Sequence, residues 1–134
     1  MKYIPVLLDI ILWIGDSITG SGSIGTSYYN SPILFRNREN IACAEYTTDK
    51  FTEEAVQFIR GNEGSPKLIY LAYNALHGPL GAPAPDKYMS RFQYKSKLLN
   101  TYAAYTAAID DGVAAVMKEL EKIGEIDNTM LVFI

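Results

Sequence analysis

The sequence has few of the residue types that usually carry chemistry, with one cysteine, one histidine and one tryptophan in 134 residues. A single cysteine, Cys43, excludes an intrachain disulfide and a zinc site built from several cysteines. A single histidine, His77, without clustered carboxylates in the sequence, argues against a metal centre assembled from this chain alone. Each remaining candidate must therefore be judged on its local sequence.

Positive charge is also sparse, and it is scattered along the chain. The 12 Lys and Arg residues face 15 Asp and Glu residues, which gives a net charge of -3. Nucleic-acid-binding proteins gather Lys and Arg on one face or along one helix, so we expect no nucleic-acid partner. The 10 tyrosines are typical of amphipathic packing at the edge of a core, with a stacking surface for sugars or bases as the alternative.

The N-terminal apolar segment, residues 3–14, is shorter than the roughly 20 residues that a membrane-spanning helix needs. It contains Pro5 and Asp9 and lacks an Ala-x-Ala cleavage pattern, which argues against a signal peptide. We therefore predict a buried strand or an irregular core segment here and no membrane partner. The cellular compartment stays open.

Two segments have the periodicity of amphipathic helices, residues 48–60 and 101–123. Thr47 or Thr48 can cap the first of them, and Gly61 is placed to end it. With 49% hydrophobic and 20% charged residues, the composition is that of a globular domain.

Uninterrupted apolar runs at residues 67–73 and 130–134 are typical of parallel strands that are covered on both faces. Residues 33–35 predict a shorter strand that enters a polar turn at 36–40. The long connection 78–100 predicts either a functional loop or a short further element. Strand, helix and strand in this order indicate a βαβ unit, and hence an α/β fold with parallel central strands flanked by helices.

His77 comes directly after the first of these predicted parallel strands, in a loop rich in glycine and proline. Ligand-binding residues of open α/β sheets gather where such strands end, so His77 is the first candidate for chemistry. The alternative is a hydrogen-bonded structural histidine.

The other candidates are weaker. Cys43 is expected to be a small packed hydrophobe. Asp110 and Asp111 are neighbours on a predicted helix and point in different directions, so a surface role or a hydrogen bond to a nearby loop is favoured over a shared metal ion. The glycine-rich residues 20–25 lack the Lys-Ser/Thr ending of a phosphate loop, and no Gly-x-Ser-x-Gly motif frames a serine nucleophile.

Several segments together resemble the middle of a type I sulfatase, closest to the arylsulfatase group. They keep the order and spacing of that family and are Leu34-Phe35-Arg36-Asn37-Arg38-Glu39, Tyr46 to Ala55, Leu68 to Leu80, Ile109-Asp110-Asp111-Gly112-Val113 and Asp127-Asn128-Thr129. The resemblance is good over residues 33–134 and weaker over the loop-rich residues 1–32. It implies a partial sulfatase catalytic domain over residues 1–134, with the alkaline-phosphatase-like α/β fold.

The resemblance also implies a role for His77. In the family, the histidine of an Asn-Ala-Pro-His-x-Pro-Leu motif helps to bind the sulfate group, and His77 stands at that place in Asn-Ala-Leu-His-Gly-Pro-Leu. Leu76 replaces the usual proline, a departure expected to loosen the loop without moving the histidine.

Family members use a calcium ion and a formylglycine formed from the cysteine of Cys-x-Pro-x-Arg. Cys43 has Glu45 and Thr47 where that motif needs proline and arginine, and the family's metal motif Asp-Asn-Gly would follow Ile134. We therefore predict a sulfate ester as the family's substrate, neither the calcium ligands nor the nucleophile within this chain, and no turnover by the chain alone. A non-catalytic anion-binding scaffold and a phosphohydrolase of the same superfamily are the alternatives. Family members are commonly secreted, lysosomal or periplasmic.

Overall fold

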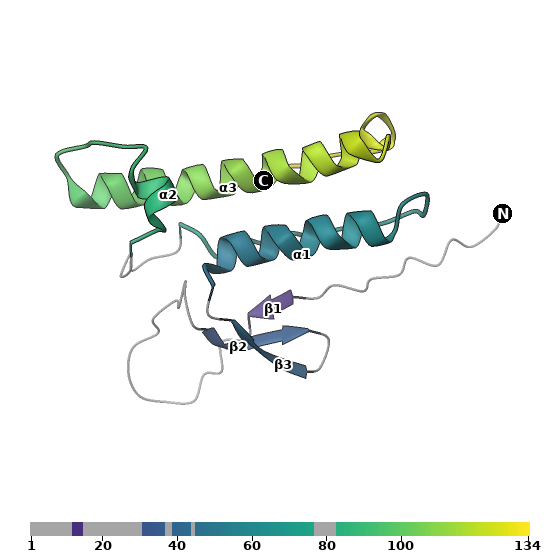
Figure 1. Ribbon diagram of the computed structural model, residues 1–134, viewed down its shortest axis with the longest axis horizontal. Helices are drawn as coiled ribbons and strands as arrows, with labels where there is room; N and C mark the ends of the chain where they lie inside the picture. The colour runs from purple at the N-terminus through teal and green to yellow at the C-terminus, as the bar shows by residue number, and fades with distance from the viewer. Residues whose placement is uncertain (1–11, 15–30, 37–38, 44, 77–82) are drawn as a thin grey trace.

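The computed structural model describes residues 12–14, 31–36, 39–43, 45–76 and 83–134. In chain order its elements are β1 (Leu12–Ile14), β2 (Ser31–Arg36), β3 (Glu39–Cys43), α1 (Thr47–Gly61), α2 (Asp86–Met89), α3 (Lys97–Lys122) and the 3-10 turn η1 (Ile126–Asn128). Figure 1 shows α1 and α3 side by side, with the small sheet on the other side of α1. The described part is thus built around a helix pair.

Helix α1 confirms the periodicity prediction for residues 48–60. Phe51, Ala55 and Ile59 are spaced four residues apart and are all buried, which places them on one face of the helix. The cap prediction is wrong, because the N-cap residue is Tyr46 and makes no side-chain capping bond. At the other end, the N–H of Asn62 donates to the carbonyl of Phe58 at 3.1 Å.

Helix α3 begins a turn earlier than the apolar pattern predicts. Ser96 is its N-cap, and its hydroxyl accepts from the N–H of Leu99 at 3.4 Å, which satisfies one of the unpaired donors of a helix start. The helix is followed by Gly124 with φ +71°, a left-handed angle that glycine adopts without strain. Among the described residues, no helix is both long and apolar enough to cross a membrane.

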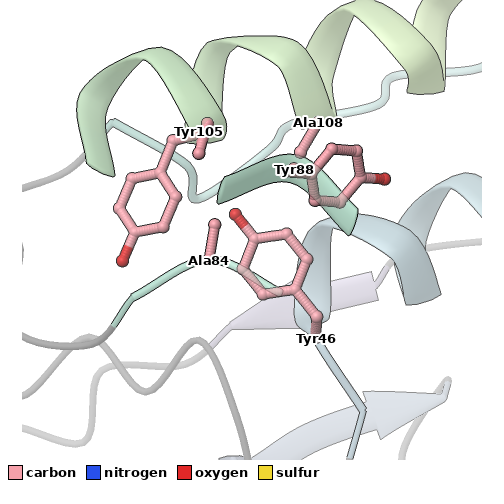
Figure 2. Close-up of a cluster of buried hydrophobic side chains, with 6 residues drawn as sticks. Tyr46, Ala84, Tyr88, Tyr105 and Ala108 are labelled. Carbon is pink, nitrogen blue, oxygen red and sulfur yellow. The ribbon is translucent and has the colours of Figure 1, made fainter. Parts of the chain in front are cut away.

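The hydrophobic core lies between the start of α1, α2 and the first half of α3. Its members are Tyr46, Ala84, Tyr88, Ala104, Tyr105 and Ala108. Figure 2 shows the tyrosine rings gathered around the small alanine side chains. The ring of Tyr46 has its centroid 6.2 Å from those of both Tyr88 and Tyr105, and such pairs add about 0.5–1.5 kcal/mol beyond the area they bury.

The long connection at residues 78–100 contains a short element, as one of its two interpretations predicts. Helix α2 is four residues long and packs against α3. It brings Tyr88 into the core at 3% exposure.

The described sheet is antiparallel, with the strand order β1-β2-β3. The predicted strand at residues 33–35 lies within β2, and the chain reverses direction within residues 36–40 as predicted, since Arg36 pairs with Glu39 and Phe35 with Asn40 in an antiparallel hairpin. The turn is narrower than predicted, because Arg36, Glu39 and Asn40 belong to the paired strands.

The predicted parallel strands are not confirmed. Residues 67–73 and 130–134 have no assigned strand, and several of their apolar side chains are exposed, including Tyr70 and Phe133. In Figure 1 each segment nevertheless returns along the helix that precedes it, and both run in the same direction. A ladder requires backbone hydrogen bonds from a neighbouring strand, which an apolar pattern alone does not specify.

Candidate functional site

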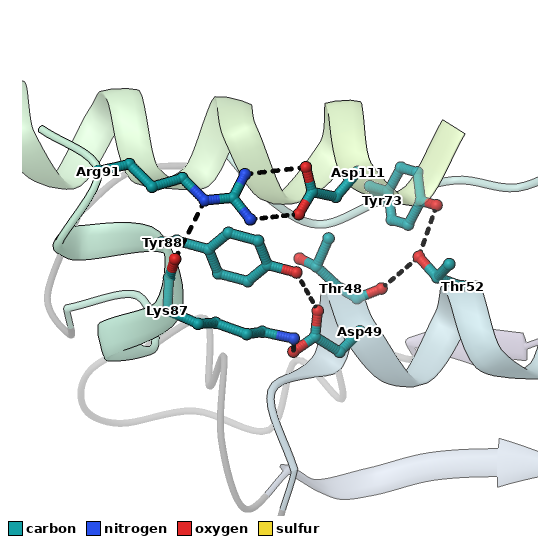
Figure 3. A network of polar contacts seen from close by, with 8 residues as sticks. All are labelled: Thr48, Asp49, Thr52, Tyr73, Lys87, Tyr88, Arg91 and Asp111. Carbon is teal, nitrogen blue, oxygen red and sulfur yellow. Dashed lines mark hydrogen bonds and ion pairs between the residues drawn. The ribbon is translucent and has the colours of Figure 1, made fainter. Parts of the chain in front are cut away.

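The segment that leads to His77 is attached to α1 by two side-chain hydrogen bonds. Thr47 donates from Oγ1 to Oδ1 of Asn74 at 3.0 Å. The hydroxyls of Tyr73 and Thr52 lie 2.8 Å apart, and Figure 3 shows this contact between the segment and the helix. Two consecutive residues of the segment are therefore fixed to the first two turns of α1.

The neighbouring contacts show which hydroxyl donates in the bond between Tyr73 and Thr52. The hydroxyl of Thr52 donates to the carbonyl of Thr48 at 2.9 Å, so its single proton is committed. Tyr73 is therefore the donor to Thr52. Burial raises the pKa of Tyr73, which keeps its hydroxyl protonated for this role.

Gly112 of α3 provides the space for this contact. A Cβ atom at Gly112 would lie 2.4 Å from Oη of Tyr73 and 2.6 Å from Oγ1 of Thr52. Any larger residue would have to displace one of these hydroxyls. The Tyr73 hydroxyl thus joins both long helices, since it bonds α1 and contacts α3.

The backbone immediately before His77 has an unusual angle. Leu76 has φ +72°, a left-handed conformation that costs an L-residue with a Cβ roughly 1–2 kcal/mol. Proline is locked near −65° and could not adopt this angle. Leu76 therefore gives the turn a different backbone from a proline-containing motif, which goes beyond the loosening expected from the sequence. His77 itself lies outside the described residues.

A second group of polar side chains surrounds Asp49 in the first turn of α1. Tyr88 donates from its hydroxyl to Oδ1 of Asp49 at 2.5 Å, and Nζ of Lys87 lies 2.8 Å from Oδ2. Figure 3 shows Tyr88 and Lys87 reaching from α2 to this carboxylate. Burial and the hydrogen bond to Asp49 raise the pKa of Tyr88, so this tyrosine acts as a donor that fastens α2 to α1.

The two adjacent aspartates of α3 have separate environments. Arg91 binds Asp111 in a bidentate manner, with N–O distances of 2.9 and 2.6 Å, and the hydrogen bond from Arg91 lowers the pKa of Asp111. Asp110 is exposed. The sequence favours a surface role or a hydrogen bond to a nearby loop for this pair; Asp110 has the first, and Asp111 has the second, because Arg91 lies in the turn after α2.

Ion pairs also join the C-terminal ends of the two long helices. Arg60 binds both carboxylate oxygens of Glu119 at 2.9 and 3.0 Å, and this hydrogen bonding lowers the pKa of Glu119 to about 2. Beyond α3, Glu125 pairs with Lys67 and accepts from the N–H of Gly64 at 2.7 Å. These contacts fasten the beginning of the segment that later reaches Asn74.

The described carboxylates do not fit a calcium site. In the part of the chain that the structure describes, no group of three or more His, Cys, Asp or Glu residues could hold a metal ion. Asp49, Asp111, Glu119 and Glu125 each pair with a lysine or arginine instead. Their chemistry is structural, because each neutralises a cation that joins two elements.

Of the other candidates from sequence, Cys43 is the last residue of β3, and the glycine-rich residues 20–25 lie outside the described part. Sequence reasoning missed Thr47 and Tyr73 as anchors of the segment before His77. Asn74 was within the recognised motif, so its position was a signal that the segment before the histidine is important. Nothing in the sequence shows that Thr47 would meet it.

Comparisons with known proteins agree on one family. The family model described as Sulfatase matches residues 14–134. The chain is 39% identical over 120 residues to the uncharacterized sulfatase YdeN of Escherichia coli (strain K12), covering 88% of this chain and 21% of that protein. It is 27% identical over 93 residues to Arylsulfatase J of Mus musculus, covering 66% of this chain and 15% of that protein.

Solved structures give the same result. The crystal structure of Ps i-CgsB in complex with k-i-k-neocarrahexaose matches with a TM-score of 0.66 and 38% identity, over 72% of this chain and 22% of that one. A second crystal structure of Ps i-CgsB, described without that ligand, matches equally well. The chain spans about a fifth of the length of YdeN and of Ps i-CgsB. The family match, the relatives and the shared fold together show that this chain belongs to the sulfatase family.

Proposed function

We propose that this chain forms part of the catalytic domain of a sulfuric ester hydrolase and that His77 binds the sulfate group of the substrate. The observation that carries the proposal is the motif Asn-Ala-Leu-His-Gly-Pro-Leu, located where a segment anchored on α1 ends. Membership of the sulfatase family supports it.

An imidazole suits this task chemically. Negative charge develops on the sulfuryl and leaving-group oxygens as the ester bond breaks, and a placed donor stabilises that charge. The unperturbed pKa of histidine, about 6.5, lets the side chain donate from an imidazole N–H either as a cation or as a neutral ring. We assign His77 the binding of the sulfate oxygens and no proton-transfer step.

The family resemblance implies calcium and formylglycine as partners in this chemistry. The described carboxylates do not fit a calcium site. The residues after Cys43 do not fit the motif in which formylglycine forms. We therefore derive no step through either group. We expect the 134-residue chain by itself to bind a sulfate group without hydrolysing the ester.

The relatives suggest which sulfate esters to offer. The name Arylsulfatase J points to aryl sulfates, and the complex of Ps i-CgsB contains neocarrahexaose, which points to carbohydrates. Both classes should be tested, with inorganic sulfate as the ligand common to them.

The single histidine makes the binding test direct, since the imidazole signals in an NMR spectrum of the chain have one source. A bound anion favours the imidazolium, so added sulfate should raise the pKa of His77. The variant His77→Gln should lose sulfate binding measured by calorimetry. An unchanged pKa of His77 at saturating sulfate would refute the proposal, and a response to phosphate alone would favour the phosphohydrolase.

An activity assay tests the expectation that the chain alone does not hydrolyse the ester. We expect no hydrolysis of 4-nitrophenyl sulfate or of a sulfated oligosaccharide by the purified chain. Calcium-dependent turnover that survives Cys43→Ala would contradict this expectation, because it would show a nucleophile that the sequence did not reveal.

A further inference from the structure

We propose that Thr47 and Asn74 are positioning residues for His77, so that a part-buried hydrogen bond to the start of α1 sets the affinity for the anion. The inference rests on the proposed function, since it concerns how the same histidine is held. Neither residue contacts the ligand in this proposal. Both act through the short stretch of chain between Asn74 and His77.

The first support is the long-range bond of Thr47. Thr47 is the first residue of α1, one position after the N-cap residue Tyr46, so capping this helix end is not its role. Its hydroxyl donates to Asn74, 27 residues away. Thr47 is 0% exposed, so water does not reach its hydroxyl, whereas Asn74 at the other end of the bond is half-buried.

The second support is that the attachment has two points. Tyr73 bonds Thr52 in the next turn of α1, directly beside the bond of Asn74 to Thr47. One bond alone would leave the segment free to rotate about it. Two bonds from adjacent residues to successive turns fix both the position and the rotation of the backbone.

The third support is the strained angle at Leu76. A left-handed angle at a residue with a Cβ persists only where its surroundings hold it, and Leu76 is 37% exposed, so its own side chain contributes limited packing. The anchor at Asn74 lies two residues before it. We infer that this anchor holds the turn from which His77 follows.

The effect on binding depends on the fraction of molecules in which the turn has the binding-competent conformation. If the anchor is lost, the turn samples other conformations, and the apparent affinity falls with the fraction that remains competent. A net hydrogen bond of ordinary strength corresponds to a factor of roughly three to ten. We therefore expect Thr47→Val to weaken sulfate binding by about that factor.

The test compares four variants of the full 134-residue chain by the His77 NMR titration with inorganic sulfate. Thr47→Val removes the donor, Thr47→Ser keeps it, and Asn74→Ala removes the acceptor at a half-buried site. The matched control is Thr101→Val, because Thr101 is also buried and its hydroxyl donates within α3, to the carbonyl of Lys97 at 3.0 Å. Thermal melting of each variant is recorded alongside.

We expect weaker sulfate binding in Thr47→Val and Asn74→Ala, and binding close to that of the unaltered chain in Thr47→Ser and Thr101→Val. A merely structural role would lower the melting temperature of Thr47→Val and Thr101→Val alike and leave both affinities unchanged, which would overturn this inference alone. Should Thr47→Val not fold, Asn74→Ala decides the question by the same criterion. If the unaltered chain shows no response to sulfate, the proposed function fails and the inference falls with it.

Discussion

Gly112→Ala tests the packing that brings Tyr73 between the two long helices. Alanine is normally favoured over glycine inside a helix, by about 1 kcal/mol, so the substitution would stabilise an isolated α3. In this fold the new Cβ would lie 2.4 Å from Oη of Tyr73 and 2.6 Å from Oγ1 of Thr52. Neither distance is tolerable without movement of the tyrosine or the threonine.

The expected magnitude follows from three contributions. Crowding a packed site by one methyl group costs about 1–3 kcal/mol, and breaking the hydrogen bond between Tyr73 and Thr52 costs about 0.5–1.5 kcal/mol. Subtracting the gain in helix propensity leaves a net loss of about 0.5–3.5 kcal/mol in the free energy of unfolding. For a chain of this size, that is a decrease of roughly 2–14 °C in melting temperature.

Urea unfolding followed by circular dichroism measures this loss, and Gly61→Ala is the matched control. Gly61 is also helical, yet a Cβ there would meet no atom within 4 Å, so we expect unchanged or higher stability. Combining Gly112→Ala with Tyr73→Phe removes the nearest atom, and the two losses should then be less than additive. A Gly112→Ala variant as stable as Gly61→Ala would refute the reasoning.

Three further predictions concern the contacts that join the elements. Glu119→Gln should make the stability of the fold depend less on pH in the acidic range. Arg60 lowers the pKa of Glu119 from 4.5 to about 2, so the carboxylate stabilises the fold above about pH 4.5 and this contribution is lost as the pH falls toward 2. Melting curves at several pH values check this, and an unchanged slope of melting temperature against pH would contradict it. Tyr88→Phe should lower the free energy of unfolding by about 1.5–3 kcal/mol, the range for a bond to a charged acceptor, with little further loss when Asp49→Asn is added in a double-mutant cycle. Leu76→Pro should lower the melting temperature, because proline cannot adopt a positive φ, whereas Leu76→Gly should leave it nearly unchanged; equal melting of the two variants would argue against the left-handed turn.

The helices were predictable because apolar residues at helical spacing lie close together in the sequence. Phe51, Ala55 and Ile59 repeat at helical intervals, and the same face is buried once the chain folds. The start of α3 was missed, because Ser96 caps the helix through a local contact outside the apolar pattern. Of the hairpin, β2 and the turn were predicted, and only β3 was missed, since the polar side chains of Glu39 and Asn40 concealed a backbone that pairs with β2.

The apolar runs at residues 67–73 and 130–134 show the limit of the pattern more clearly. Their composition predicts burial on both faces, but a strand is defined by its hydrogen-bonded neighbour, and that neighbour can be far away in sequence. Their common direction along α1 and α3 (Figure 1) fits the order of helices and segments. The parallel ladder itself stays a prediction.

The family could be recognised from the order and spacing of motifs along the chain, and one of those motifs contains His77. The sequence by itself also determined the two long helices, because helical periodicity is a property of neighbouring residues. The contact of Thr47 with Asn74, and the space that Gly112 leaves for Tyr73 beside Thr52, depend on the folded arrangement instead. The physical reason is that each of these contacts joins residues distant in sequence, and hydrogen-bond geometry and steric fit exist only once α1, α3 and the segment between them have come together.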